Sequence, residues 1–167
     1  MSNSTYILDD TLLASKGGRF LNYFLDVVFS LFLIFVIGVI IAFLAATFGW
    51  NEVLYRMSNM TDLEGQIVFV VIRLFYYILT EGFLGRSFAK FITGTVVVDE
   101  NGRKPSFGTV IKRSLCRIIP FDGLSFLGDR GWHDSISDTY VVNKKDLDVD
   151  MKTFHELQLI GVQESQS

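Results

Sequence analysis

Residues 20–48 read FLNYFLDVVFSLFLIFVIGVIIAFLAATF, an almost unbroken apolar run. Its strongly polar members are few: Asn22, Asp26, Ser30 and Thr47. Crossing the hydrocarbon core of a bilayer takes about 20 residues of helix at about 1.5 Å rise each. The run exceeds that length, and a buried helix in a soluble protein is rarely so uniformly apolar. We therefore predict a membrane span over about residues 20–45.

A second apolar run, residues 66–84, follows a polar connection. It is just long enough to span, although Arg73 and Glu81 interrupt it, and each such charge costs about 2.5–3.5 kcal/mol near the bilayer centre on insertion scales. Thr61 followed by Glu64 fits a capping box that opens this helix. The two runs together predict a transmembrane helical hairpin.

Composition agrees with a membrane protein. Half of the 167 residues are hydrophobic, the mean hydropathy is +0.38, and the apolar residues gather in the two runs. The net charge of −3 offers no global basic surface for nucleic acid. A single cysteine, Cys116, excludes an intrachain disulfide. The first apolar run is too long for the core of a cleavable signal peptide, so we expect it to stay as an anchor.

The pattern changes beyond Gly85. Residues 95–98 and 139–142 are β-branched and short, which favours two strands that pair as a small membrane-proximal sheet. Between them, residues 106–127 begin as an amphipathic helix whose cations lie away from its apolar face: Lys112, Arg113 and Arg117. We predict that this segment lies in the interface or re-enters the membrane, with the cations reaching water. A full third span is the alternative, and it would bury those cations.

The predicted fold is an all-α membrane protein, a transmembrane hairpin followed by a membrane-proximal cytoplasmic segment with an amphipathic basic helix and a small β element. Residues 1–18 form a cytoplasmic N-terminal segment, and residues 19–142 form the membrane domain. Residues 143–167 are polar and predict a mobile cytoplasmic tail, with at most a short helix around Lys152–Ile160.

Basic residues predict the orientation. The connection of residues 49–65 holds one, Arg56, whereas Lys16 and Arg19 precede the first run. Seven more lie between the second run and Ile118: Arg86, Lys90, Arg103, Lys104, Lys112, Arg113 and Arg117. Because cytoplasmic loops carry an excess of lysine and arginine, both termini are expected in the cytoplasm.

Charged groups inside a membrane are candidates for a functional site. Asp26 and Arg73 are predicted to lie about 10 Å and about 16 Å above the cytoplasmic helix ends, a difference that the arginine stem covers. Arg19 and Glu81 both lie near the cytoplasmic boundary. We therefore predict two ion pairs between the helices, called rungs here: Asp26 with Arg73 and Arg19 with Glu81. Asn22 lies in the same polar stripe. Such pairs either lock the hairpin or let Asp26 bind or relay a cation or proton.

Several short motifs occur in a fixed order along the chain. They are KGGRFLNYFLD at 16–26, EGFLGRS at 81–87, VD at 98–99, PSFG at 105–108, GWHDSI at 131–136 and TYVV at 139–142. Together, over about residues 14–142, they resemble the RDD family of membrane proteins, named for an arginine and two aspartates. Arg19, Asp26 and Asp134 match those three positions.

The resemblance implies a small polytopic protein of the bacterial inner (cytoplasmic) membrane. The function of that family is largely undefined, although transport has been suggested. Asp134 lies in a glycine-flanked cytoplasmic loop, and we expect it either to return to Arg19 and dock the segment onto the hairpin or merely to cap its loop.

No catalytic arrangement, metal-ligand spacing or phosphate-binding glycine loop stands out, so we expect no enzyme, no cofactor and no metal site. Two functions stay open. The first is transport of an ion or small ligand, which requires an oligomer because two helices enclose no pathway. The second is a non-transporting scaffold or assembly factor that binds other membrane proteins. The expected partners are the lipid bilayer, further copies or other membrane proteins, and, for a transporter, a cation or proton; nucleic acid is not expected.

Overall fold

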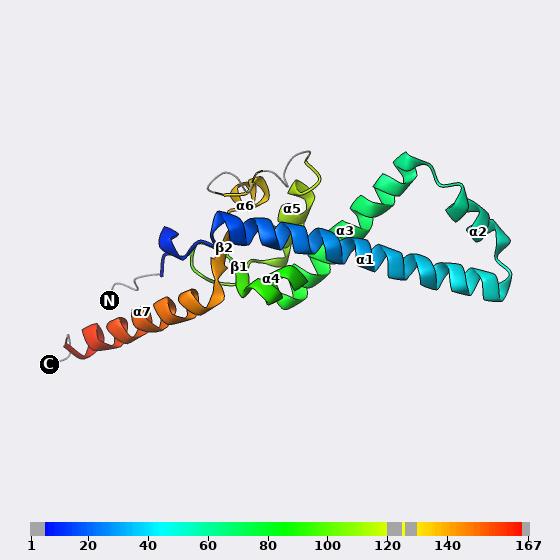
Figure 1. Ribbon diagram of the computed structural model, residues 1–167. Coiled ribbons are helices and arrows are strands. Elements are labelled where there is room, and N and C mark those ends of the chain that lie inside the picture. The colour runs from blue at the N-terminus through cyan, green and yellow to red at the C-terminus, as the bar shows by residue number, and fades with distance from the viewer. Residues whose placement is uncertain (1–5, 120–124, 126–129, 165–167) are drawn as a thin grey trace.

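The computed structural model describes residues 6–119, 125 and 130–164, and these residues are mostly helical (Figure 1). The first apolar run lies within α1, Lys16–Phe48. This helix begins after Ser15, whose hydroxyl accepts a hydrogen bond from the Gly18 amide. It ends at Gly49, where a φ of 71° gives the left-handed conformation that glycine adopts without strain.

The second run lies within α3, Asp62–Leu84. The predicted capping box forms, because Thr61 accepts a hydrogen bond from the Glu64 amide and the Glu64 carboxylate accepts one from the Thr61 amide. A short helix that the sequence analysis did not predict, α2 at Asn51–Ser58, lies in the connection. Both α1 and α3 are long and apolar enough to cross a membrane, as the two runs predicted.

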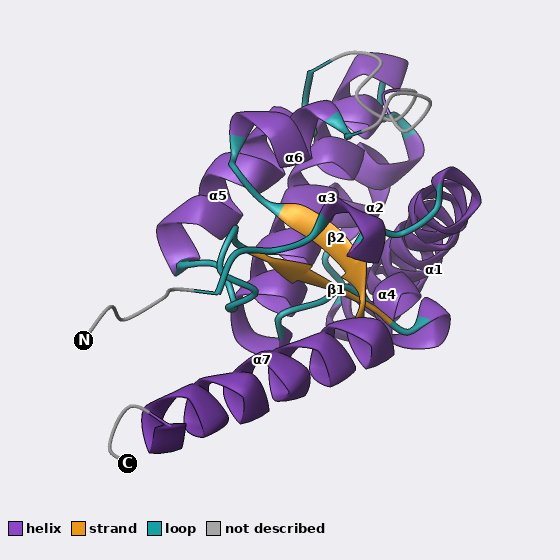
Figure 2. Cartoon of the chain, turned by 90° about the vertical axis from the view of Figure 1, so that its left-hand side faces the viewer, coloured by secondary structure: helices purple, strands orange, loops and turns teal. Residues whose placement is uncertain are grey.

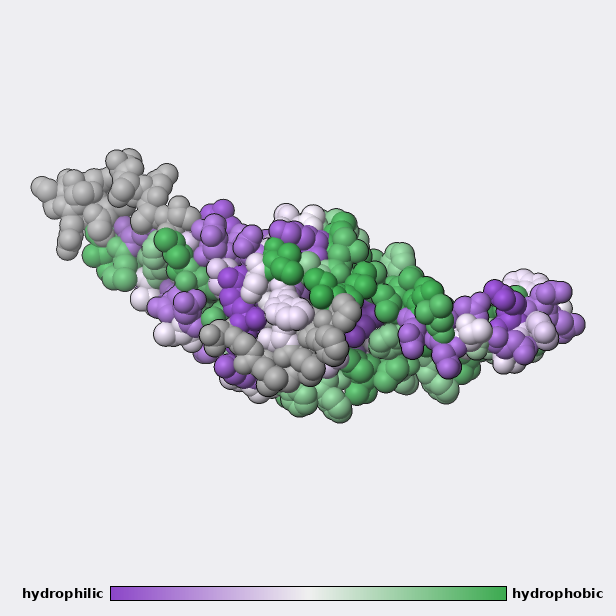
Figure 3. Space-filling view, turned by 90° about the horizontal axis from the view of Figure 1, so that it is seen from above, coloured by the Kyte–Doolittle hydropathy of each residue, from purple (hydrophilic) through white to green (hydrophobic). Residues whose placement is uncertain are grey.

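Helices α1 and α3 approach each other near the sheet and separate toward α2 (Figure 1). Within their most apolar stretches, 6% of the α1 residues and 22% of the α3 residues are buried. A core helix of a soluble protein would be mostly buried. Instead, side chains such as Phe35 and Phe43 are 67% and 68% exposed. A band of hydrophobic surface therefore lies between the polar end at α2 and the mixed surface near the sheet (Figure 3).

A small assembly, called the cap here, packs on the other end of the two helices. It comprises α4 (Phe88–Thr93), β1 (Thr95–Val98), α5 (Phe107–Cys116), α6 (Trp132–Ile136) and β2 (Tyr140–Asn143). The two strands pair antiparallel, with Val97 opposite Val141, which confirms the predicted sheet. The cap joins two regions of the sequence, residues 88–116 and 132–143, and it positions the side chains described below.

The C-terminal segment differs from its prediction. Instead of at most a short helix, it forms α7, Lys144–Glu164, which continues directly from β2 and runs beside the sheet (Figure 2). The reason is a small hydrophobic core that the sequence did not reveal, in which Leu147 packs with Tyr6, Val98 and Val142. A 3-10 turn at Asp10–Leu12 brings the N-terminal segment into the same core.

Helix α5 also differs from its prediction, because Arg113 points inward. Arg113 is fully buried while Lys112 is exposed, and the outward face carries Leu115 and Ile118, which are 50% and 47% exposed. The predicted snorkelling of Arg113 is therefore wrong. With ten residues, α5 is too short to span a membrane. The rest of the predicted segment 106–127 lies largely outside the described residues.

Candidate functional site

A polar stripe on α1 faces the cap. Asn22, Asp26 and Ser30 are spaced by four residues, so they share one helix face, and all three are buried. Asn22 donates a hydrogen bond to the Thr95 hydroxyl at 3.0 Å and accepts one from the Thr93 hydroxyl at 2.5 Å. The stripe thus fixes the end of α4 and the start of β1 against α1.

Asp26, which belongs to α1, accepts hydrogen bonds from residues at the start of α4. Its carboxylate accepts hydrogen bonds from the Tyr76 hydroxyl at 2.7 Å, the Ser87 hydroxyl at 2.7 Å and the Ala89 amide at 3.3 Å. The Phe88 amide in turn donates to the Tyr76 oxygen at 3.1 Å. Free amides at a helix start favour a negative group. Asp26 is 1% exposed, and donors from α3 and α4 occupy both of its oxygens.

Glu81 on α3 pairs with three cations of the cap. Its carboxylate lies 2.7 Å from Lys90 Nζ, 3.0 Å from Arg113 Nε and 3.0 Å from Arg117 Nη2. Burial lowers the pKa of Lys90 even though Glu81 favours its charged form. Burial is the largest influence on Arg117 and opposes its charge, but the combined attraction of Glu81, Tyr77, Asp26 and Asp134 outweighs it and raises the pKa of that guanidinium. Glu81 therefore joins α3 to both α4 and α5.

Arg113 extends this connection to α6 and β2. It forms an ion pair with Asp134 and donates a hydrogen bond to the Thr139 hydroxyl, and its side chain is fully buried. Arg130 also stabilises this connection between α6 and β2, because it donates hydrogen bonds to the backbone oxygens of Asp134 and Thr139. A continuous chain of charges thus runs from Glu81 through Arg113 to Asp134.

The predicted rungs are wrong in their partners. Asp26 contacts Tyr76, Ser87 and Ala89 in place of Arg73, and Glu81 contacts cap cations in place of Arg19. The guanidinium of Arg73 instead lies 5.3 Å from the ring centre of Tyr23 and 5.6 Å from that of Tyr77. The physical reason is that α4 packs on the polar stripe of α1, so the cap takes the place that the prediction gave to α3.

The expected docking of Asp134 onto the hairpin forms with a different partner. The carboxylate meets Arg113, which holds Glu81 of α3, whereas the prediction had chosen Arg19. Sequence reasoning also missed Lys90 and Arg117 as partners of Glu81. One signal was available, because Arg113 and Arg117 are four residues apart and therefore share a helix face.

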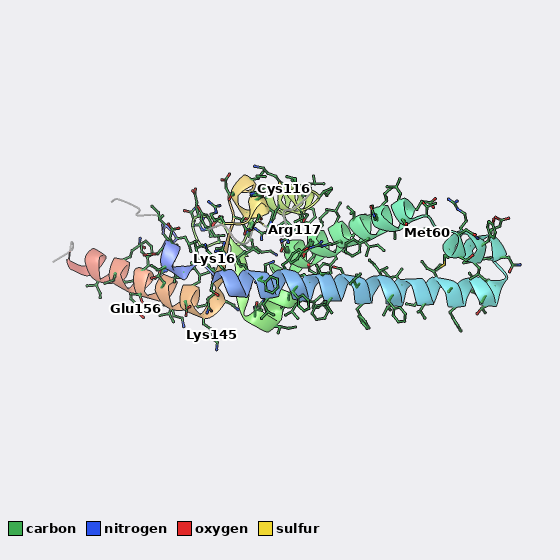
Figure 4. All side chains as sticks on the ribbon, turned by 45° about the horizontal axis from the view of Figure 1, so that its top comes forward. Lys16, Met60, Cys116, Arg117, Lys145 and Glu156 are labelled. Atoms are coloured by element: carbon green, nitrogen blue, oxygen red, sulfur yellow. The ribbon has the colours of Figure 1, made fainter. Side chains whose placement is uncertain are left out.

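A small cavity lies where α1 meets the cap. Its volume is about 40 Å³, and it is lined by Arg19, Asn22, Tyr23, Asp26, Lys90, Arg113, Arg117, Gly131, His133, Asp134 and Val141. Arg117 lies on the side of α5 that faces α1 (Figure 4). Burial, together with the nearby charges of Arg117 and Arg113, lowers the pKa of His133 well below its ordinary value. The cavity brings together Arg19, Asp26 and Asp134 with residues that the sequence analysis did not single out.

Within the described residues, no group of three histidine, cysteine or carboxylate side chains is arranged to hold a metal ion. The arrangement instead offers guanidinium and ammonium donors beside buried carboxylates. Its evident chemistry is ionic contact and hydrogen bonding.

Comparison with known proteins gives a family but no activity. A model of the RDD family matches residues 13–158. The chain is 32% identical over 142 residues to the uncharacterized protein YxaI of Bacillus subtilis (strain 168), which covers 75% of this chain and 94% of YxaI. No solved structure matches the chain.

Proposed function

Since the chain belongs to the RDD family, we propose that it is a multi-pass protein of the bacterial cytoplasmic membrane that acts as a non-enzymatic, non-transporting scaffold for other membrane proteins. The observation that carries this proposal is that the buried carboxylates of α1 and α3 are occupied within the chain. Asp26 accepts three hydrogen bonds and Glu81 pairs with three cations. A carboxylate that relays a cation or proton needs an oxygen that its cargo can reach.

The distribution of polarity supports placement in a membrane. Lys90, Arg113 and Asp134 of the cap are buried, while its exposed side chains, and that of Ile118 just beyond α5, include many apolar ones: Phe88, Ile92, Phe107, Leu115, Ile118, Trp132 and Ile136. In water, the exposure of these side chains would cost about 25 cal/mol of free energy for each Å² of apolar area. Next to lipid the same area carries no such penalty, which favours an interfacial or re-entrant position for the cap.

We place both termini in the cytoplasm and α2 outside. The two termini lie at the end of the molecule that holds the cap, far from α2 (Figure 1). The connection that contains α2 holds one basic residue, Arg56, whereas lysines and arginines concentrate near the cap. This charge bias supports the proposed orientation.

The surface that the scaffold would offer lies on α1 beyond the cap. Phe32, Phe35, Val39 and Phe43 are 52–68% exposed there, and α3 has separated from α1 at this level. An apolar helix face that its own chain leaves uncovered is available to a helix of another membrane protein. Helices pack in membranes through such van der Waals contact.

A photo-crosslinking experiment tests the scaffold role in cells. A benzoyl-phenylalanine placed at Phe43 should crosslink to a second membrane protein, which includes another copy of this chain. The same probe at the buried Tyr77 serves as the matched control and should give no adduct. Absence of any protein adduct at Phe43, Phe35 and Phe32 would overturn the scaffold proposal.

Transport by an oligomer is the competing function, and reconstitution separates the two. Purified protein in liposomes should show no proton or sodium flux above that of empty liposomes. Flux that disappears in Asp26→Asn would establish transport and overturn our proposal. The matched variant Lys112→Gln removes an exposed charge and reports nonspecific effects.

A further inference from the structure

We propose that the cavity between α1 and the cap binds a phosphate-type anion, either the phosphate of a lipid headgroup or free inorganic phosphate. This site goes beyond the scaffold role and does not rest on it. The wall of this cavity holds N–H donors that have no hydrogen-bond partner among the described residues.

Two guanidinium groups in the cavity wall have buried nitrogen atoms without a hydrogen-bond partner. These atoms are Nη2 of Arg113 and Nε of Arg117. The two side chains are 0% and 9% exposed, so water does not freely satisfy them. A buried charged donor that stays unsatisfied is unfavourable, and the planar fork of a guanidinium matches the oxygens of a phosphate.

The wall of the cavity is rich in N–H donors. Among the described residues the lining contributes four cations, Arg19, Lys90, Arg113 and Arg117, and two carboxylates, Asp26 and Asp134. Glu81 pairs with Lys90, Arg113 and Arg117, so four positive charges stand against three negative ones. The unused guanidinium donors therefore favour an anion more than the net charge does, in a largely buried site where screening by water is weak.

The size of the cavity restricts the ligand. A volume of about 40 Å³ exceeds the ~10–15 Å³ that one water requires. It suits one phosphate group or a few waters, and it excludes a nucleotide or a sugar ring. Asp26 lies about 15 Å along α1 from its first residue, at 1.5 Å per residue. In the proposed topology this is near the cytoplasmic boundary, where both lipid phosphates and free phosphate are within reach.

Calorimetric titration of the full-length protein in an uncharged detergent tests the site in two arms. The first arm titrates sodium phosphate, with sodium chloride of equal ionic strength as reference. The second titrates short-chain phosphatidylglycerol, with short-chain phosphatidylcholine as reference. Saturable binding in the first arm alone identifies free phosphate as the ligand, and in the second alone a lipid headgroup. Binding in both supports the shared phosphate chemistry, and binding in neither overturns the proposal.

Three variants locate the binding. Arg117→Lys keeps a positive charge beside Glu81 but removes the fork, and we expect affinity to fall about tenfold, the effect of one charge-assisted hydrogen bond. Val141→Leu keeps every cation and adds volume to the cavity wall, and it should weaken binding at least as much. Lys112→Gln removes an exposed charge from the same helix and should leave the affinity unchanged. If Arg117→Lys does not fold, Val141→Leu decides. Binding that no cavity variant weakens relative to Lys112→Gln overturns the assignment.

Discussion

Replacing Arg113 with methionine should loosen the attachment of the cap to α3. The variant loses the contact of Nε with Glu81 at 3.0 Å and the bonds to Asp134 and Thr139, all from a fully buried side chain. Removing one partner of a buried ion pair costs about 3–5 kcal/mol, because the other charge is left uncompensated. Glu81 keeps Lys90 and Arg117. Asp134 alone is stranded, so the cost should lie near the lower end, about 3 kcal/mol.

Limited proteolysis of the purified protein in mild detergent measures this cost. If the cap opens and closes faster than it is cleaved, the cleavage rate follows the open population. A change of about 3 kcal/mol then accelerates cleavage within residues 85–142 by roughly 100-fold or more, at tenfold per 1.4 kcal/mol. Lys112→Met, at the neighbouring exposed position, should change the rate by less than about twofold.

A second substitution tests whether the uncompensated charge of Asp134 causes this loss of protection. Asp134→Asn alone should loosen the cap, and Asp134→Asn added to Arg113→Met should recover part of the protection, since the stranded charge is gone. Equal cleavage of Arg113→Met and Lys112→Met would refute the reasoning. So would a double variant that is cleaved faster than Arg113→Met alone.

The remaining predictions concern α1, α3 and α6. Asp26→Asn should lower the free energy of unfolding by about 1–3 kcal/mol, because the amide cannot accept from all three donors, as measured by titration with denaturing detergent. Because the pKa of His133 is lowered in the folded protein, the unfolded chain binds more protons than the folded one below about pH 6.5. The free energy of unfolding should therefore fall as the pH decreases below that value, by at most about 1.4 kcal/mol per pH unit. His133→Gln should remove that component of the slope, and an unchanged slope would count against it. Gly82→Ala should destabilise the protein, since a Cβ there lies 2.7 Å from the Phe107 ring, whereas Gly65→Ala meets nothing within 4 Å and should be neutral or stabilising by up to about 1 kcal/mol in a thermal melt.

Local pattern was sufficient for α1, α3 and the two strands, but it did not predict α2, α4 or α6. The apolar runs predicted α1 and α3 because their length and uniformity depend only on neighbouring residues, and the β-branched segments predicted the sheet for the same reason. The capping box at Thr61 is equally local. The extent of α7 was not predictable in this way, because it depends on Leu147 meeting Tyr6 across almost the whole chain.

Partner choice was not predictable from local pattern. Matching Asp26 with Arg73 assumed that α1 and α3 pack along their polar faces. In the structure α4 packs on the α1 stripe, and Ser87 and Ala89 supply donors that a helix-pair argument does not consider. The sequence identified Asn22, Asp26 and Glu81 as buried groups, but their partners, which include the unexpectedly buried Lys90 and Arg113, depend on how a distant segment folds back.

The orientation of α5 shows why the prediction of its cations failed and what that failure means. The prediction placed the helix in the membrane interface or re-entering the membrane, with its cations turned outward to reach water. In water, turning α5 by half a turn would bury Leu115 and carry Ile118, just beyond the helix, toward the interior, each worth about 1.5–3 kcal/mol. The same turn would return Arg113 to solvent and would expose the one buried apolar residue of α5, Val110. The structure holds the opposite arrangement, with Arg113 inside and both apolar side chains outside. That arrangement is stable where the surroundings are themselves apolar and the interior supplies Glu81 and Asp134 as partners. The cap therefore favours lipid as its solvent independently of the length of α1 and α3.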